Sequence, residues 1–200
     1  MMNYGKIAST YDDKYTSAMC IRENTAIRDI LERYAAGKRV LDVGCGTGLS
    51  LDLCKGIHPD DYCGLDVSLD MITIASRKHP YHTFVEVEAE RFVTSEKYDV
   101  ALCLFSIPYI GERAVTAIYE ALKPGGVVVC VCYNKPYLNP SSVYGGHKWK
   151  YRFTVAWKVR KVLAKFEHHF LKTDESDLVP GSANKAYKVI IYKKKEVLAQ

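Results

Sequence analysis

Short apolar runs alternate along this chain with segments of helical periodicity, and this alternation is what most constrains its fold. The segments between the runs place apolar residues three or four positions apart, as on one face of a helix. Nearly continuous apolar strands that alternate with helices are typical of a parallel sheet covered on both faces. The sequence therefore predicts an α/β fold with a doubly wound, mostly parallel sheet. The expected strands are Arg39–Val43, Tyr62–Asp66, His82–Val87, Val100–Leu104, Val127–Val131 and Tyr187–Lys193.

Helices are expected between these strands, and local signals mark where they begin and end. Ser68 is a good N-cap for a helix that continues to Lys78, because its side chain can accept a hydrogen bond from a backbone N–H of the first turn. Lys123–Gly126 (KPGG) is predicted to be a turn, since proline and glycine end helices. The other expected helices are Ile27–Tyr34, Leu49–Lys55, Arg113–Leu122 and Val155–Phe166.

Length and composition indicate one ordinary domain, because the chain has 200 residues, of which 48% are hydrophobic and 26% charged. No apolar run approaches the ~20 residues of a membrane span, so no membrane partner is expected. Seven cysteines without a C-x-x-C pair favour a reduced, cytoplasmic protein. His168 and His169 are adjacent rather than at ligand spacing, so no metal site is expected. A monomer or a weak homodimer is the default expectation.

The densest motif is Asp42–Gly48 (DVGCGTG), which follows one predicted strand and opens a helix. Glycines there permit a tight turn and the close approach of a ligand to the backbone. Asp66 ends the next strand, where a carboxylate can accept hydrogen bonds from both hydroxyls of a ribose. The dinucleotide fingerprint is not met, because Leu49 stands in place of its last glycine. Asp42 would also oppose a pyrophosphate, which disfavours a nicotinamide-dependent oxidoreductase and favours a ligand with positive charge.

Over approximately residues 4–133 the chain resembles the class I S-adenosyl-L-methionine-dependent methyltransferases. VLDVGCGTG resembles the first motif of that family and YCGLDVS the second, and VEAERF, YDVALCLF and ALKPGG resemble the segments that follow in order. The resemblance implies a seven-stranded, Rossmann-like sheet with an N-terminal helical cap, and S-adenosylmethionine as cofactor with S-adenosylhomocysteine as product. It divides one domain, 1–200, into cap helices (1–36), a cofactor-binding core (37–133) and a substrate-side connection, helix and last strands (134–200).

The resemblance also implies roles for single residues. The backbone of Gly44 and Gly46 would hold the methionine part of the cofactor, and Asp66 would bind its ribose. The other implied cofactor-binding residues are Asp42 near the ammonium, Glu88 and Ala89 beside the adenine, Leu104 at the methionine end, and Tyr11, which would close over the cofactor from the segment 6–15.

Candidate catalytic residues are harder to name, because methyl transfer from a sulfonium needs orientation more than acid–base help. Tyr133 and Asn134 follow the fifth predicted strand, and His147 could act as a base near neutral pH. Ser106 and Tyr109 belong to SIPY, which resembles the S/N/D-x-P-Y motif of methyltransferases that modify adenine or amide nitrogens. Ser106 comes two residues later than that motif requires, which favours coincidence.

The region from Gly146 to Gln200 is strongly basic, and its net positive charge exceeds the net charge of the whole chain, which is +5. Within it, His147–Phe153 alternates basic and aromatic residues, as in binders of single-stranded nucleic acid, although an amphipathic strand or the start of a helix would explain the pattern too. A small-molecule acceptor is the favoured interpretation, because no nucleic-acid-binding domain is appended. The alternatives are a methyltransferase acting on RNA, DNA or protein, and a non-catalytic S-adenosylmethionine-binding protein.

Overall fold

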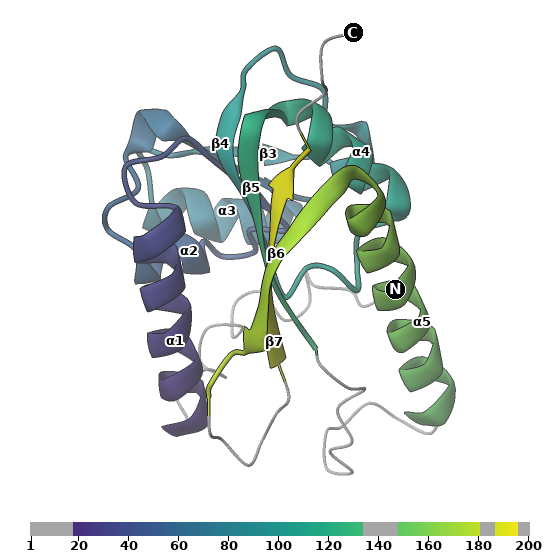
Figure 1. Ribbon diagram of the computed structural model, residues 1–200. Coiled ribbons are helices and arrows are strands. Elements are labelled where there is room, and N and C mark those ends of the chain that lie inside the picture. The colour runs from purple at the N-terminus through teal and green to yellow at the C-terminus, as the bar shows by residue number, and fades with distance from the viewer. Residues whose placement is uncertain (1–17, 134–147, 181–186, 196–200) are drawn as a thin grey trace, which may run out of the picture.

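One sheet of seven strands runs through the computed structural model, which describes residues 18–133, 148–180 and 187–195 (Figure 1). The strand order is β3-β2-β1-β4-β5-β7-β6. The strands are β1 (Val40–Val43), β2 (Tyr62–Asp66), β3 (Thr83–Glu86), β4 (Tyr98–Leu104), β5 (Leu122–Tyr133), β6 (Phe170–Asp177) and β7 (Tyr187–Lys194). The helices are α1 (Ala18–Tyr34), α2 (Leu49–Leu53), α3 (Leu69–Lys78), α4 (Glu112–Ala121) and α5 (Lys148–His169), with 3-10 turns η3 (Pro59–Asp61) and η4 (Ala89–Arg91).

The first five strands are parallel, and β7 runs antiparallel to both of its neighbours, β5 and β6. β1 pairs in parallel with β2 on one side and with β4 on the other. β3 and β5 extend the sheet in parallel, whereas β7 pairs antiparallel with both β5 and β6. The predicted mostly parallel, doubly wound sheet is confirmed. The strand order reverses between β1 and β4, so the carboxyl ends of these two strands border the crevice where such sheets bind ligands.

Helices cover both faces of the sheet, as predicted. Figure 1 shows α1 and α2 on one side of the sheet and α4 and α5 on the other. Successive residues of a strand point to opposite faces, so Leu102 of β4 packs in the layer of α1 and α2, whereas Cys103 packs in the layer of α4 and α5. Both side chains are fully buried. Burial of apolar area contributes roughly 25 cal/mol per Å², and its presence on both faces fixes the register of the central strands.

β5 is longer than the apolar run Val127–Val131 that predicts it. The prediction that Lys123–Gly126 forms a separate turn is wrong, because this segment lies inside β5. Tyr98 pairs with Leu122 and Val100 with Val127, so the KPGG residues bulge out opposite the single residue between Tyr98 and Val100. Pairing with β4 on both sides of the bulge therefore outweighs the local preference for a chain reversal.

Two further elements differ from the expectation. The edge strand β6 is not predicted, because its residues between the first and the last positions are exposed and carry no apolar pattern. α5 begins at Lys148, well before Val155, so the basic and aromatic residues 148–153 are helical. The start of a helix, one of the interpretations of their alternation, is therefore confirmed, and they do not form a strand with one basic and one aromatic face.

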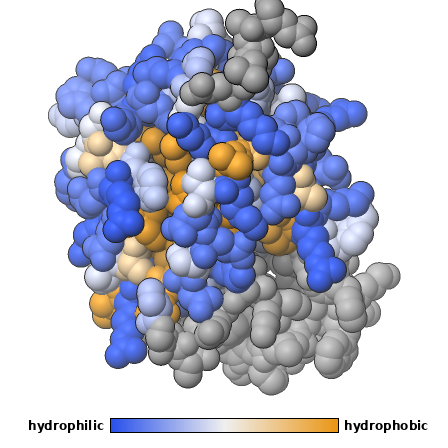
Figure 2. Space-filling view, viewed as in Figure 1, coloured by the Kyte–Doolittle hydropathy of each residue, from blue (hydrophilic) through white to orange (hydrophobic). Residues whose placement is uncertain are grey.

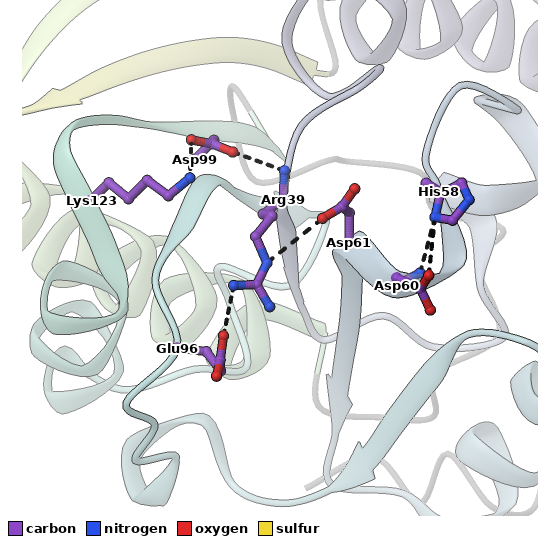
Figure 3. A network of polar contacts seen from close by, with 7 residues as sticks. All are labelled: Arg39, His58, Asp60, Asp61, Glu96, Asp99 and Lys123. Carbon is purple, nitrogen blue, oxygen red and sulfur yellow. Dashed lines mark hydrogen bonds and ion pairs between the residues drawn. The ribbon is translucent and has the colours of Figure 1, made fainter.

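Ion pairs and hydrogen bonds between charged residues link the strands at the amino edge of the sheet (Figure 3). Arg39, directly before β1, donates from its backbone N–H to Asp99 Oδ2 at 3.0 Å and from its guanidinium to Glu96 Oε2 at 2.6 Å. Asp61 Oδ1 lies 3.7 Å from Arg39 Nε, and Lys123 Nζ lies 2.8 Å from Asp99 Oδ1. These side chains are partly exposed, so each ion pair contributes about 1 kcal/mol at most. The network aligns the starts of the strands and leaves the opposite, carboxyl edge for a ligand site.

Candidate functional site

The glycine loop, Gly44–Gly48, joins β1 to α2 at the carboxyl edge of the sheet. The N–H groups of Gly44 and Cys45 both donate to the carbonyl of Leu65, at 2.7 and 2.9 Å, which holds the loop over the end of β2. Gly44, Gly46 and Gly48 have φ angles of 74°, 54° and 88°, a region that other residues rarely adopt. The path of the loop therefore depends on the three glycines of the sequence motif.

The surroundings of the first two glycines differ. A Cβ atom built on Gly44 would lie 2.5 Å from the Cβ of Ser106, which follows the end of β4. A Cβ atom built on Gly46 would meet no atom within 4 Å. The loop is thus packed against the rest of the protein at Gly44 and open at Gly46, where a ligand could approach the backbone closely.

Asp66 ends β2 and ties the open part of the loop to the next helix. Its Oδ2 accepts a hydrogen bond from the N–H of Gly46 at 3.0 Å, and its Oδ1 accepts one from the N–H of Ser68 at 2.9 Å. Burial raises the pKa of this carboxyl, while the hydrogen bonds from the two backbone N–H groups lower it. Each carboxylate oxygen has a second lone pair, so Asp66 can accept hydrogen bonds from a ligand while it holds the loop.

Asp42 is a buried acid in the middle of the fold, only 1% exposed. Its Oδ2 accepts hydrogen bonds from Ser50 Oγ of α2 at 2.5 Å and from Tyr62 Oη of β2 at 3.0 Å. Its Oδ1 is buried and has no partner among the described residues. Burial raises the pKa of this carboxyl to about 6, although the hydrogen bonds from Ser50 and Tyr62 lower it. Asp42 is therefore mostly ionised at neutral pH. Its two hydroxyl partners could not be predicted from the sequence, because they come from other elements of the fold.

The chain leaves β4 through a turn with a backbone outlier. Leu104 is the buried last residue of β4, and Phe105 after it has a φ of 61°, the one positive value at a non-glycine residue in the described chain. A left-handed backbone costs such a residue about 1–2 kcal/mol. The Phe105 N–H donates to the carbonyl of Val131 at 2.8 Å, and its ring packs edge-on against Tyr187, with centroids 5.1 Å apart. The role of Phe105 could not be predicted from the sequence, because no property of the residue type predicts this conformation.

The two residues expected beside an adenine follow β3. Glu88 is half-exposed, and its Oε2 lies 3.0 Å from Nε of Arg91. Ala89 begins η4 and packs against the hydrophobic core. Glu86, two positions before Glu88, pairs with Asp66 in the sheet, so the structure puts Glu88 near the same edge as Asp66 with its side chain at the surface.

The structure describes some of the residues that were candidates for contact with the methyl acceptor. Tyr133 is the last residue of β5 and pairs with Tyr187 of β7, which puts its backbone at the carboxyl edge. Ser106 and Tyr109 belong to a turn in which the Tyr109 N–H donates to the Ser106 carbonyl at 2.8 Å. Three predicted site residues lie outside the described ranges, namely Tyr11, Asn134 and His147.

The described part of the chain contains neither a group of metal-ligating side chains nor a helix that could span a membrane. No three His, Cys, Asp or Glu side chains within it are grouped so that they could hold a metal ion. Its helices include none that is long and apolar enough to cross a membrane. None of the seven cysteines, all of which the structure describes, takes part in a disulfide.

Comparison with known proteins identifies relatives. Residues 20–172 match the profile of a family described as a methyltransferase domain. A phthiotriol/phenolphthiotriol dimycocerosates methyltransferase 1 of Mycobacterium ulcerans (strain Agy99) is 34% identical over 101 residues, which are 47% of this chain and 37% of that protein. A ubiquinone biosynthesis O-methyltransferase of Pseudomonas putida (strain W619) is 30% identical over 109 residues, 50% of this chain and 46% of that protein. The aligned part is less than half the length of either relative.

The fold matches that of a solved methyltransferase. The crystal structure of the N-methyltransferase NodS from Bradyrhizobium japonicum WM9 with S-adenosyl-L-homocysteine has a TM-score of 0.63 to this chain and covers 88% of it, with 87% of its own chain aligned. At 16% identity this likeness concerns the fold. The family profile, by contrast, matches most of the sequence and spans strands β1 to β5, the glycine loop and α5. The chain therefore belongs to the class I S-adenosylmethionine-dependent methyltransferase family.

Proposed function

We propose that this protein transfers a methyl group from S-adenosylmethionine to a small-molecule acceptor at the carboxyl edge of the sheet. The observation that carries the proposal is the glycine loop, which is open at Gly46 and hydrogen-bonded there to the carboxylate of Asp66. An open backbone beside a carboxylate suits a nucleoside without phosphates. The buried charge of Asp42 supports this ligand, since it would oppose a pyrophosphate and favour an ammonium.

The residues present fit the cofactor. Asp66 would accept hydrogen bonds from the ribose hydroxyls, and the backbone of Gly44 and Gly46 would lie against the methionine part. Asp42 would supply negative charge close to the ammonium. The remaining contacts would come from Glu88 and Ala89 at the adenine, Leu104 at the methionine end and, outside the described residues, Tyr11.

The protein's contribution to the reaction is alignment. When bound, S-adenosylmethionine supplies a methyl group on a positively charged sulfur, which is a good leaving group without acid catalysis. Holding an acceptor in line with that methyl group and excluding water can supply several kcal/mol. The hydrogen bonds of Gly44 and Cys45 to Leu65, and the contact between Gly44 and Ser106, keep the glycine loop fixed relative to β2 and β4.

The acceptor would lie over the carboxyl ends of β4 and β5. The half-buried rings of Phe105 and Tyr187 meet there, and Tyr133 ends the strand between them. Aromatic side chains offer apolar area with few polar atoms, which suits a small apolar or aromatic acceptor. The names of the two curated relatives, which refer to ubiquinone and to dimycocerosates, mention neither nucleic acid nor protein. Tyr133, Asn134 and His147 are the candidates for a group that contacts the acceptor.

Calorimetric titration with S-adenosylhomocysteine tests the cofactor assignment. We expect Asp66→Ala to weaken binding about tenfold or more, because it removes hydrogen bonds to a charged group worth about 1.5–3 kcal/mol. Asp174→Ala, in the edge strand β6, is the matched control and should bind like the wild type. Retained affinity in Asp66→Ala would contradict the ribose role, and a wild type that does not bind would contradict the proposed function.

Methyl transfer from labelled S-adenosylmethionine into fractionated cell extract tests the class of acceptor. Label in the small-molecule fraction is the expected result. Label in RNA or protein, lost on nuclease or protease treatment, would replace the small molecule with a macromolecular acceptor. Cofactor binding without label in any fraction would favour a non-catalytic S-adenosylmethionine-binding protein.

A nucleic-acid acceptor is the second candidate, and the outer face of α5 favours it. Val159 faces the core, whereas Trp157, Lys158 and Arg160 are exposed, with 57% of Trp157 accessible. Lys161 Nζ lies 4.1 Å from the centre of the Trp157 ring. An exposed ring flanked by cations can stack a base and contact phosphates. RNA binding that weakens steeply with salt and is lost in Trp157→Ala would favour this candidate, and salt-independent binding would count against it.

A further inference from the structure

We propose that Ser106 is a cofactor-binding residue whose hydroxyl hydrogen-bonds the amino-acid end of S-adenosylmethionine, the end that carries an ammonium and a carboxylate. The inference rests on the proposed function, because it adds a residue to the same site. At the end of β4, a residue with a strained backbone, a buried hydroxyl and the glycine loop meet.

The hydroxyl of Ser106 is buried and has no hydrogen-bond partner among the described residues. The residue as a whole is 6% exposed. A buried hydroxyl without a partner costs free energy, because it has given up its hydrogen bonds to water. Native proteins satisfy most such groups, and each exception asks for an explanation. A ligand that hydrogen-bonds this hydroxyl would remove the cost.

The place of this hydroxyl indicates which ligand it would meet. The Cβ and Oγ atoms of Ser106 lie 2.5 and 3.3 Å from the position that a Cβ of Gly44 would take. The N–H of Gly44 donates to Leu65, and the carbonyl of Ser106 accepts from Tyr109. These two backbone groups are thus engaged, and the Ser106 hydroxyl is a polar atom without a hydrogen-bond partner at the contact between the two residues. The methionine part of the cofactor would lie along this same stretch of loop.

The backbone outlier at Phe105 explains how Ser106 reaches the loop. Asp42 pairs with Leu102, so an unbent β4 would bring Leu104 beside Gly44 and carry Ser106 roughly 6–7 Å beyond it. The left-handed turn at Phe105 instead brings Ser106 back against Gly44. Strain of this kind is typical of functional sites, and here it positions a polar atom that has no partner within the protein.

Some of the other buried polar atoms without hydrogen-bond partners lie away from the glycine loop. His82, whose ring nitrogens have no partner, directly precedes β3. Tyr192, whose hydroxyl has none, lies where β7 pairs with the amino-terminal part of β5. Both belong to the amino edge of the sheet, away from the glycine loop. Two more do lie at the loop: Asp42 Oδ1 directly before it, and His79 Nε2 against Gly48, 3.1 Å from Asp52 Oδ1. Ser106 carries the one hydroxyl among these three groups, and it lies where the end of β4 meets Gly44.

Titration of the full chain with two ligands tests the proposal. S-adenosylhomocysteine carries the amino-acid end, and 5′-methylthioadenosine is an adenosine thioether without it. A hydroxyl can donate to a carboxylate and accept from an ammonium, so we expect Ser106→Ala to weaken S-adenosylhomocysteine about tenfold and to bind methylthioadenosine like the wild type. Asp66→Ala should weaken both ligands, since both contain the ribose. Thr173→Val, which removes a hydroxyl that donates to the Ile191 carbonyl in the remote strand pair, is the control and should change neither affinity.

Unfolding of the ligand-free protein separates a binding role from a packing role. Ser106→Ala should be at least as stable as the wild type, because it deletes an unpartnered hydroxyl, and its Tm should rise less on addition of S-adenosylhomocysteine. Equal affinity of Ser106→Ala and wild type for S-adenosylhomocysteine would overturn the proposal, as would equal losses for the two ligands, which would indicate a distorted loop. A wild type that binds neither ligand would refute the proposed function instead. If Ser106→Ala does not fold, Ser106→Cys, with its weak donor, should show the same discrimination between the ligands.

Discussion

Asp42→Asn should remove a pH dependence of stability that arises in the core. The Asp42 carboxyl has a pKa of about 6 in the folded protein, against an ordinary value of 3.8. Between these values the folded protein binds more protons than the unfolded chain, so its free energy of unfolding falls as the pH rises. One pH unit corresponds to 1.36 kcal/mol, so the whole effect is roughly 3 kcal/mol. This contribution of Asp42 to the free energy of unfolding is present below about pH 4 and is lost by about pH 7. About 2 kcal/mol of it is lost between those two pH values.

Urea unfolding of wild type and Asp42→Asn at pH 4, 5, 6 and 7 measures this effect. Asparagine keeps the shape of the side chain and cannot ionise, and any cost of its buried amide is the same at each pH. Titrating groups that do not interact with Asp42, Asp99 among them, are common to both proteins and cancel in the difference. On going from pH 4 to pH 7, the wild type should lose about 2 kcal/mol relative to the variant. Parallel pH profiles for the two proteins would refute the reasoning.

Further outcomes follow from the same contacts. An ammonium near Asp42 would lower its pKa, so calorimetry should show the affinity for S-adenosylhomocysteine rising between pH 5 and pH 7. Gly46→Ala should cost only about 1 kcal/mol in urea unfolding but abolish cofactor binding, because its Cβ would project into open space above the loop. Gly44→Ala should lose about 2 kcal/mol or more, since its Cβ would meet Ser106. Arg39→Ala should lose about 1 kcal/mol, and less at high salt, because its ion pairs are exposed.

The central sheet could be predicted because its strands are apolar on both faces. Leu102 and Cys103 point into different layers, yet both are buried, and this gives the continuous apolar run in the sequence. The helix start at Ser68 could be predicted as well, since its Oγ accepts a hydrogen bond from the Met71 N–H at 3.4 Å. β6 could not, because it is held by backbone pairing with β7 while the side chains between its first and last residues face water. The residue pattern therefore predicts an element only where burial or capping by its side chains stabilises that element.

The same division applies to the site. The glycine loop and Asp66 can be located from residue type and position, because a tight turn needs glycine and a ribose needs an acceptor. The charge of Asp42 cannot, since it depends on Ser50 and Tyr62, which reach Oδ2 through the packing of α2 and the pairing of β1 with β2. A carboxyl at the same depth without those two hydroxyls would have a still higher pKa and would be neutral over more of the physiological range. Chains that share the motif DVGCGTG can therefore place an acid of different charge beside the same ligand, and the contacts made by neighbouring strands decide which.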